Sequence, residues 1–165
     1  MNAALIAALR ARIPAIRDRW AALLRIERVD SPLAHPDALA YLMPSTIDQV
    51  LTALAETRSP ALTLAAAQAL PKPDCRCVHN PYVPYFRAGE QALIEALVFA
   101  QAERGGLQTR DAELAAVIAA LRRIAHEEVE TFCAVCSHRC TAGDCRFRPG
   151  DGAAAEQSSP DRADR

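Results

Sequence analysis

Six cysteines in two clusters are the residues of this chain whose type and spacing are best suited to chemistry. The first cluster is Cys75-Arg-Cys77, and the second is Cys133-x2-Cys136-x3-Cys140-x4-Cys145. Closely spaced thiols in a reducing compartment more often bind a metal or cycle between redox states than form structural disulfides. The cysteines therefore predict a metal centre or a thiol redox site.

One pair from each cluster would surround an ion with four thiolates, the tetrahedral coordination that zinc prefers. The first-choice ligand set is therefore Cys75, Cys77, Cys133 and Cys136. Cys133 and Cys136 are three positions apart, so they fall within about 60° of each other on a helix. A shared ion would link a central loop to a helix about sixty residues further along the chain and would stabilise the fold.

The last four cysteines, which include Cys140 and Cys145, form a competing ligand set within one short segment. Some zinc knuckles and iron–sulfur loops use sets of this kind, and Gly143 would permit the necessary turn. His79 and His138 are possible further ligands, which would allow two bound metals. The sequence does not rank these partitions.

Glu90 and Glu128 lie on the apolar stripes of two expected helices and form a weaker second constellation. With His126 nearby, they suggest a metal site rich in oxygen and nitrogen inside a helical bundle. Di-iron bundles place a Glu-x-x-His motif on each of two helices, and this chain contains no such motif. Charges at helix ends and on solvated faces are therefore the preferred interpretation.

Composition and periodicity predict an all-α fold. The chain has 165 residues, about the length of one domain, and is 51% hydrophobic, enough for a core. Its low aromatic content of 5% and its abundance of alanine, leucine and arginine favour helix over sheet. We expect a single domain over residues 1–147, built as a bundle of five or six helices, and a disordered tail over 148–165.

Prolines and capping residues predict where the first helices begin and end. Pro14 should kink or divide an apolar pattern of helical period that covers residues 5–24. A short helix over residues 37–43 should be stopped by Pro44, and Ser45 should cap the helix that follows.

The second half of the chain predicts an irregular loop between helices. Ser59-Pro60 should open an alanine-rich helix, and the prolines of residues 71–81 should then form the loop that carries the first cysteine cluster. Pro84 should begin a long helix that ends at Gly105-Gly106. Thr109 should cap the last helix, and the second cluster begins on its final turns.

Aromatic side chains are expected to pack rather than to react. Trp20 has helical spacing from apolar neighbours and should lie in the core. Tyr82, Tyr85 and Phe86 follow the predicted loop, and we expect them to pack it against the bundle. The alternative is that they line a small pocket beside the metal.

Charge and missing motifs argue against several functions. With 19 basic and 20 acidic residues, the chain has a net charge of −1 and no footprint for nucleic acid or an anionic membrane. We expect neither a secretory signal nor a membrane span. Phosphate-binding loops, nucleophile elbows and zinc-protease motifs are absent from the sequence, so catalysis is not expected.

The sequence thus predicts a small cytoplasmic protein that binds a metal, zinc in the first instance, and has a sensing, regulatory or protein-interaction role. Its expected partner is another protein, and self-association into a homo-oligomer is left open. Two alternatives stay beside this prediction. One is an iron–sulfur or metal-handling accessory protein, and the other is a thiol redox switch.

Overall fold

The structure is a computed structural model and describes residues 2–26, 39–56, 63–72, 74, 80–103 and 111–135. These residues form α-helices and one short 3-10 helix, with no strand among them, so the predicted all-helical class is confirmed for this part of the chain. In chain order the elements are α1 (Ala3–Ala11), α2 (Ile13–Leu24), η2 (Ala40–Leu42), α4 (Met43–Glu56), α5 (Leu64–Ala69), α6 (Tyr82–Ala102) and α7 (Asp111–Val135).

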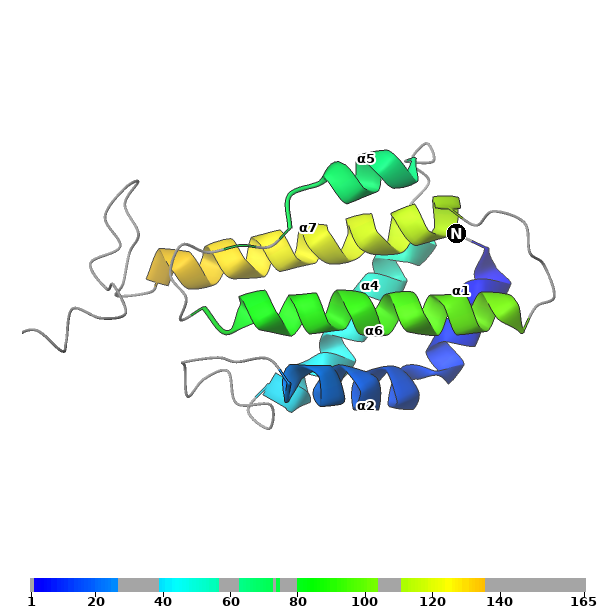
Figure 1. The fold of residues 1–165 in the computed structure, drawn as a ribbon, viewed down its shortest axis with the longest axis horizontal. Helices are drawn as coiled ribbons and strands as arrows, with labels where there is room; N and C mark the ends of the chain where they lie inside the picture. The colour runs from blue at the N-terminus through cyan, green and yellow to red at the C-terminus, as the bar shows by residue number, and fades with distance from the viewer. Residues whose placement is uncertain are drawn as a thin grey trace, which may run out of the picture.

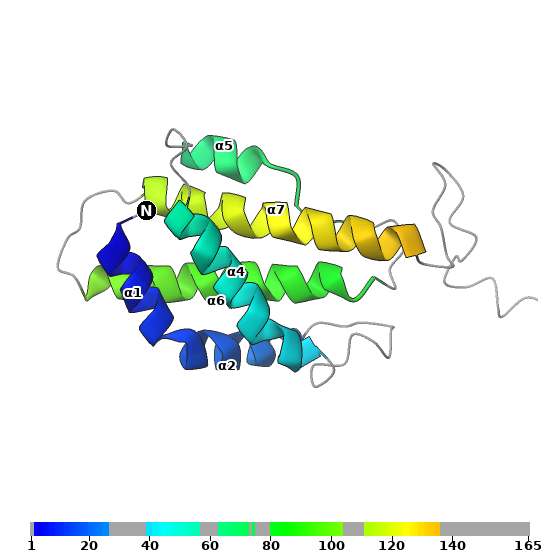
Figure 2. The same cartoon turned by 180° about the vertical axis from the view of Figure 1, so that it is seen from behind.

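The helices pack around α6. In Figure 1, α6 runs along the molecule between α7 and α2, and it is antiparallel to both. Figure 2 shows that α1 and α4 cross one face of this layer at a steep angle. The short helix α5 lies outside α7 and packs against it. The start of α6 and the end of α7 therefore lie at the same end of the molecule.

Trp20 anchors the core between α2 and α6, as its helical spacing predicts. Its side chain is fully buried, its ring centre lies 4.7 Å from that of Tyr85, and its indole N–H donates to the Tyr85 carbonyl oxygen at 2.8 Å. Gly89 lies beneath the indole, and a Cβ there would fall 2.2 Å from a ring carbon. The two helices can approach this closely because position 89 has no side chain.

The predicted division of the first helical pattern is confirmed. The pattern breaks at Arg12, and Pro14 lies in the first turn of α2. The backbone N–H groups in the first turn of a helix have no helical partner, so proline loses no hydrogen bond there. Its ring would clash with a preceding helical turn, and the pattern therefore divides before it.

The prediction that Pro44 stops a short helix is wrong. The 3-10 helix leads directly into α4, which begins at Met43, so Pro44 lies in its first turn, where a missing N–H is tolerated. Ser45 is therefore inside α4 and does not cap it. The neighbouring Thr46 makes the local contact instead, because its hydroxyl donates to the Leu42 carbonyl at 3.1 Å.

Thr63 is the N-cap of α5, and its hydroxyl accepts a hydrogen bond from the Ala66 N–H at 3.2 Å. Pro84 lies in the first turn of α6, close to the predicted start. Of the predicted loop over 71–81, residues 71, 72, 74, 80 and 81 are described, and they are not helical. The prediction that Ser59-Pro60 opens the alanine-rich helix is wrong, because Thr63 has an extended backbone and α5 begins at Leu64. The predictions for Gly105-Gly106, Thr109 and the tail over 148–165 lie outside the described residues.

None of the described helices is both long and apolar enough to span a bilayer.

Candidate functional site

The predicted metal ligands lie mostly outside the described residues. Cys133 is described, near the end of α7, with its side chain partly exposed. The other candidates lie outside the described ranges: Cys75, Cys77, Cys136, Cys140, Cys145, His79 and His138. Among the described residues, no three His, Cys, Asp or Glu side chains are grouped as a metal site. The choice between the two cysteine partitions stays a prediction.

Asn80 links the start of α6 to Cys133. Its side-chain N–H₂ group donates to Cys133 Sγ at 3.3 Å and to the Val129 carbonyl oxygen at 3.4 Å. Its side-chain oxygen accepts from the Tyr82 N–H at 3.0 Å, which forms a local turn before α6. Asn80 is only 1% exposed, so these bonds satisfy a buried amide and hold it in one orientation.

Asp74 is the described residue that precedes the first cysteine cluster. One of its carboxylate oxygens lies 3.8 Å from a guanidinium nitrogen of Arg87, in the second turn of α6. Both side chains are largely exposed, so this ion pair contributes little to stability. It nevertheless shows that the chain on either side of residues 75–79 contacts the first turns of α6.

Aromatic rings close this end of the helix layer. The ring of Tyr82 meets that of Phe132, at the end of α7, edge to face with 5.8 Å between ring centres. Tyr85 and Phe86 are buried, and their rings also meet edge to face, with centres 5.1 Å apart. These rings pack within the core, whereas most of the loop over 71–81 that they were predicted to pack against the bundle lies outside the described part of the chain.

A small cavity of about 80 Å³ opens beside these rings, between α4, α6 and α7. Its lining includes Thr46, Tyr82, Tyr85 and Glu128. Burial raises the pKa of Tyr82, and the nearby Glu128 carboxylate raises it further. Burial also raises the pKa of Tyr85, against the opposing effect of its 2.9 Å hydrogen bond with Thr46. Both phenols therefore stay protonated at neutral pH and provide no general base.

Glu90 serves an ion pair rather than a metal site. Arg122, on α7, donates from two guanidinium nitrogens to the two carboxylate oxygens of Glu90, each at 2.8 Å. The side chain of Arg122 is 5% exposed, and its hydrogen bond with Glu90 raises its pKa. Its third nitrogen donates to the carbonyl oxygens of Ala67, Gln68 and Leu70 at the end of α5.

His126 likewise has a partner other than a metal site in this structure. It pairs with Glu130 one turn later on α7, at 3.0 Å, and both side chains are mostly exposed. The exposed pair agrees with the interpretation of these charges as solvated ones. For Glu90 that interpretation is wrong, because its carboxylate lies in a largely buried ion pair with Arg122. Arg122 was not singled out from the sequence, although its position on the apolar stripe between Ile118 and Ala125 was a signal that it is buried.

Comparisons of the chain with protein-family models, with curated proteins and with solved structures found no match. Function is therefore inferred from the residues and geometry of this chain.

Proposed function

We propose that this chain is a small cytoplasmic zinc-binding protein, in which Cys75, Cys77, Cys133 and Cys136 bind one ion. The supporting observation is the contact of 3.3 Å between Asn80 and Cys133 Sγ. Asn80 follows the first cysteine cluster closely in sequence and Cys133 opens the second, so the two clusters are attached to residues that touch.

Covalent chain length is consistent with a shared ion. Cys77 precedes Asn80 by three residues, and Cys136 follows Cys133 by three residues. Three residues span at most about 10 Å when fully extended. Cys75 directly follows Asp74, which contacts the same end of α6. All four sulfurs are therefore tethered within short reach of one end of the helix layer, as a tetrahedral thiolate site requires.

Asn80 has the chemistry of an outer-shell partner for a metal-bound thiolate. A zinc-bound sulfur carries negative charge and accepts hydrogen bonds from surrounding N–H groups, which orient the ligand and tune the metal. The amide of Asn80 is buried, held by two other hydrogen bonds, and directed at Cys133 Sγ. Such a donor is favourable beside a thiolate and would be retained when the ion binds.

In this proposal the ion joins a central loop to the end of α7, so the conformation of the loop depends on metal supply and on the oxidation state of the thiols. Such dependence suits a sensing or regulatory protein that acts on a protein partner. A reducing cytoplasm would keep the cysteines as thiols available for zinc.

Purification without air, followed by metal analysis and a visible spectrum, tests the proposal. We expect equimolar zinc and a colourless protein, since zinc has no visible absorption from d electrons. A brown sample that contains iron and sulfide would indicate an iron–sulfur cluster in place of zinc. A metal-free protein with titratable thiols would instead identify a redox switch, and either result would contradict the zinc assignment.

A further inference from the structure

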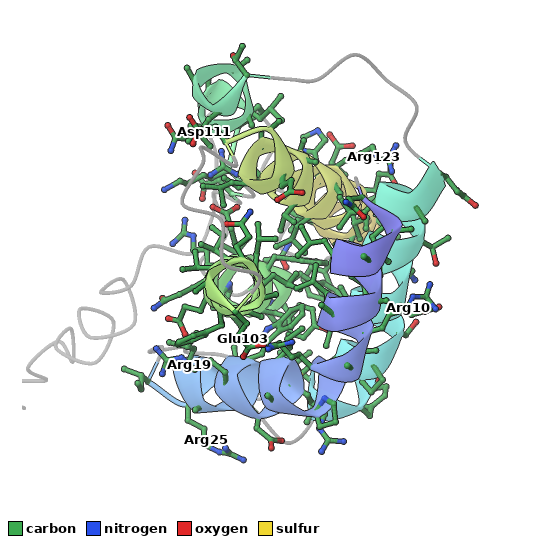
Figure 3. The ribbon with its side chains drawn as sticks, turned by 90° about the vertical axis from the view of Figure 1, so that its right-hand side faces the viewer. Arg10, Arg19, Arg25, Glu103, Asp111 and Arg123 are labelled. Carbon is green, nitrogen blue, oxygen red and sulfur yellow. The ribbon has the colours of Figure 1, made fainter. Side chains whose placement is uncertain are left out.

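The short helix α5 packs on the outside of the helix layer. In Figure 3, which views the molecule from the right-hand side of Figure 1, α5 lies beyond α7, on the side opposite α2. It has 6 residues, and Ala67 is the buried residue among them. Isolated helices of this length are not stable in water, so α5 depends on its contacts with α7. None of its residues is a ligand in the proposed zinc site.

The apolar contacts of α5 are separate from the main core. Ala67 packs with Ala115 and Ile118 of α7, and these three buried residues form a cluster of their own. The main core is built mainly from buried residues of α1, α2, α4, α6 and α7, and it includes none of the three. Loss of the α5 contacts would therefore leave Trp20 and the rest of the main core packed as they are.

Arg122 is the polar anchor of α5, and it is held from the opposite side. One guanidinium nitrogen, Nη1, donates to the carbonyl oxygens of Ala67, Gln68 and Leu70, the nearest of them at 2.8 Å. Its Nε and Nη2 donate to the two carboxylate oxygens of Glu90 on α6, each at 2.8 Å. The pairing with Glu90 does not involve α5, so Arg122 would keep its place if α5 left and could bind the same carbonyl groups again. Water can reach the freed groups, so opening leaves no polar group buried without a partner.

We propose that α5 is a latch, which detaches from α7 and docks again as one unit while the other described helices stay folded. Proteins open locally in such units where few buried apolar contacts join a segment to the rest. Opening uncovers Ala115, Ile118 and the Nη1 donor of Arg122 on α7, a surface that the closed form hides from any protein partner. The latch thereby controls access to that surface.

Hydrogen exchange of the full chain as purified, under reductant and in increasing urea below the unfolding transition, tests the latch. The probe is the Ala67 N–H, which donates to the Thr63 carbonyl oxygen at 2.9 Å. We expect it to exchange at least about tenfold faster than the buried amides of α6. Its rate should change little with urea, because undocking of α5 exposes much less surface than global unfolding does.

Ala67→Arg places a large cation at the buried contact and beside Arg122, so it should hold α5 open. The amides of α5 should then lose their protection, whereas those of α2 and α6 should keep the native rates. Ala66→Arg is the matched control, because position 66 is exposed, and it should keep the native rates throughout.

Three results would overturn the proposal. A common rate and a common urea dependence for α5 and α6 would make α5 part of one cooperative unit. A native chain without protection in α5 would have no closed latch. Global unfolding of Ala67→Arg, or faster exchange in its α2, would tie α5 to the main core. The latch uses no cysteine, so a chain that binds no zinc still tests it, and failure of either proposal leaves the other standing.

Discussion

Single residues decide how closely α2 and α6 approach. Gly89 is required because the Trp20 ring occupies the space of a side chain at that position, and its role is steric. Trp20 in turn fixes the backbone of α6 through its hydrogen bond to the Tyr85 carbonyl. Both contacts join residues far apart in sequence, so helical periodicity could not predict that Trp20 pairs with Gly89 and with Tyr85.

Gly89→Ala should destabilise the protein by about 1–3 kcal/mol, because the added methyl group would force Trp20 or α6 to shift. Alanine has the higher helix propensity, so propensity alone predicts the opposite sign. Urea denaturation measures the change in the free energy of unfolding. The penalty should shrink in a Trp20→Leu background, where the ring is gone, and a neutral Gly89→Ala variant would contradict the packing described.

The raised pKa of Tyr85 should make the free energy of unfolding depend on pH in the alkaline range. Burial raises its pKa above the ordinary value of 10. Above that pH the unfolded chain releases the phenolic proton while the folded chain keeps it, so the folded state binds more protons. The contribution of Tyr85 is therefore complete below pH 10 and is lost as the pH rises above it.

The free energy of unfolding, measured by denaturant titration between about pH 9 and pH 11, should fall less steeply in Tyr85→Phe than in the native chain. Tyr41→Phe changes an exposed tyrosine and serves as the control that keeps the native slope. Equal slopes in all three proteins would show that Tyr85 does not carry this dependence.

At the scale of elements, α5 is attached to the rest of the molecule by a small apolar cluster with α7 and by one buried polar side chain. The helix has 6 residues, and Ala67 is the buried residue among them. Arg122 donates to three carbonyl oxygens at its end, where the helix dipole is negative and carbonyl groups lack helical partners. Glu90 holds the guanidinium in place, so α5, α6 and α7 meet at one buried ion pair.

Arg122→Ala should cost about 3 kcal/mol of stability, because it leaves Glu90 and the end of α5 without their donor. Hydrogen exchange of the backbone amides in α5 should accelerate more than exchange in α2, which has no contact with Arg122. Arg123→Ala removes the neighbouring, exposed arginine and should change stability by less than about 0.5 kcal/mol. Similar effects of the two substitutions would contradict the attachment of α5 through Arg122.

Helix positions were largely predictable because they follow from local periodicity and from proline. Examples are the division at Pro14 and the beginning of α6 near Pro84. The prediction that Pro44 ends a helix was wrong, because a proline's missing N–H is harmless in the first turn of the next helix. The Arg122–Glu90 pair was not predicted, because it joins residues of different helices whose packing the sequence does not specify.

At the scale of the whole molecule, α6 is the element on which the others depend. Its buried face packs on α1, α2 and α7, and its first turns contact the flanks of the first cysteine cluster. The sequence could identify the cysteines by spacing. The contact of Asn80 with Cys133 joins positions 53 residues apart and needed the structure.

Cobalt titration of the air-free, metal-depleted chain tests the shared ion most directly, because thiolate coordination gives Co²⁺ an intense absorption that reports the bound sulfurs. The native chain and Cys140→Ser/Cys145→Ser should bind equimolar cobalt with the same four-thiolate spectrum. Cys75→Ser/Cys77→Ser should lose tight binding. If Cys75→Ser/Cys77→Ser keeps the native spectrum and Cys140→Ser/Cys145→Ser loses it, the last four cysteines form the site and the shared ion is wrong.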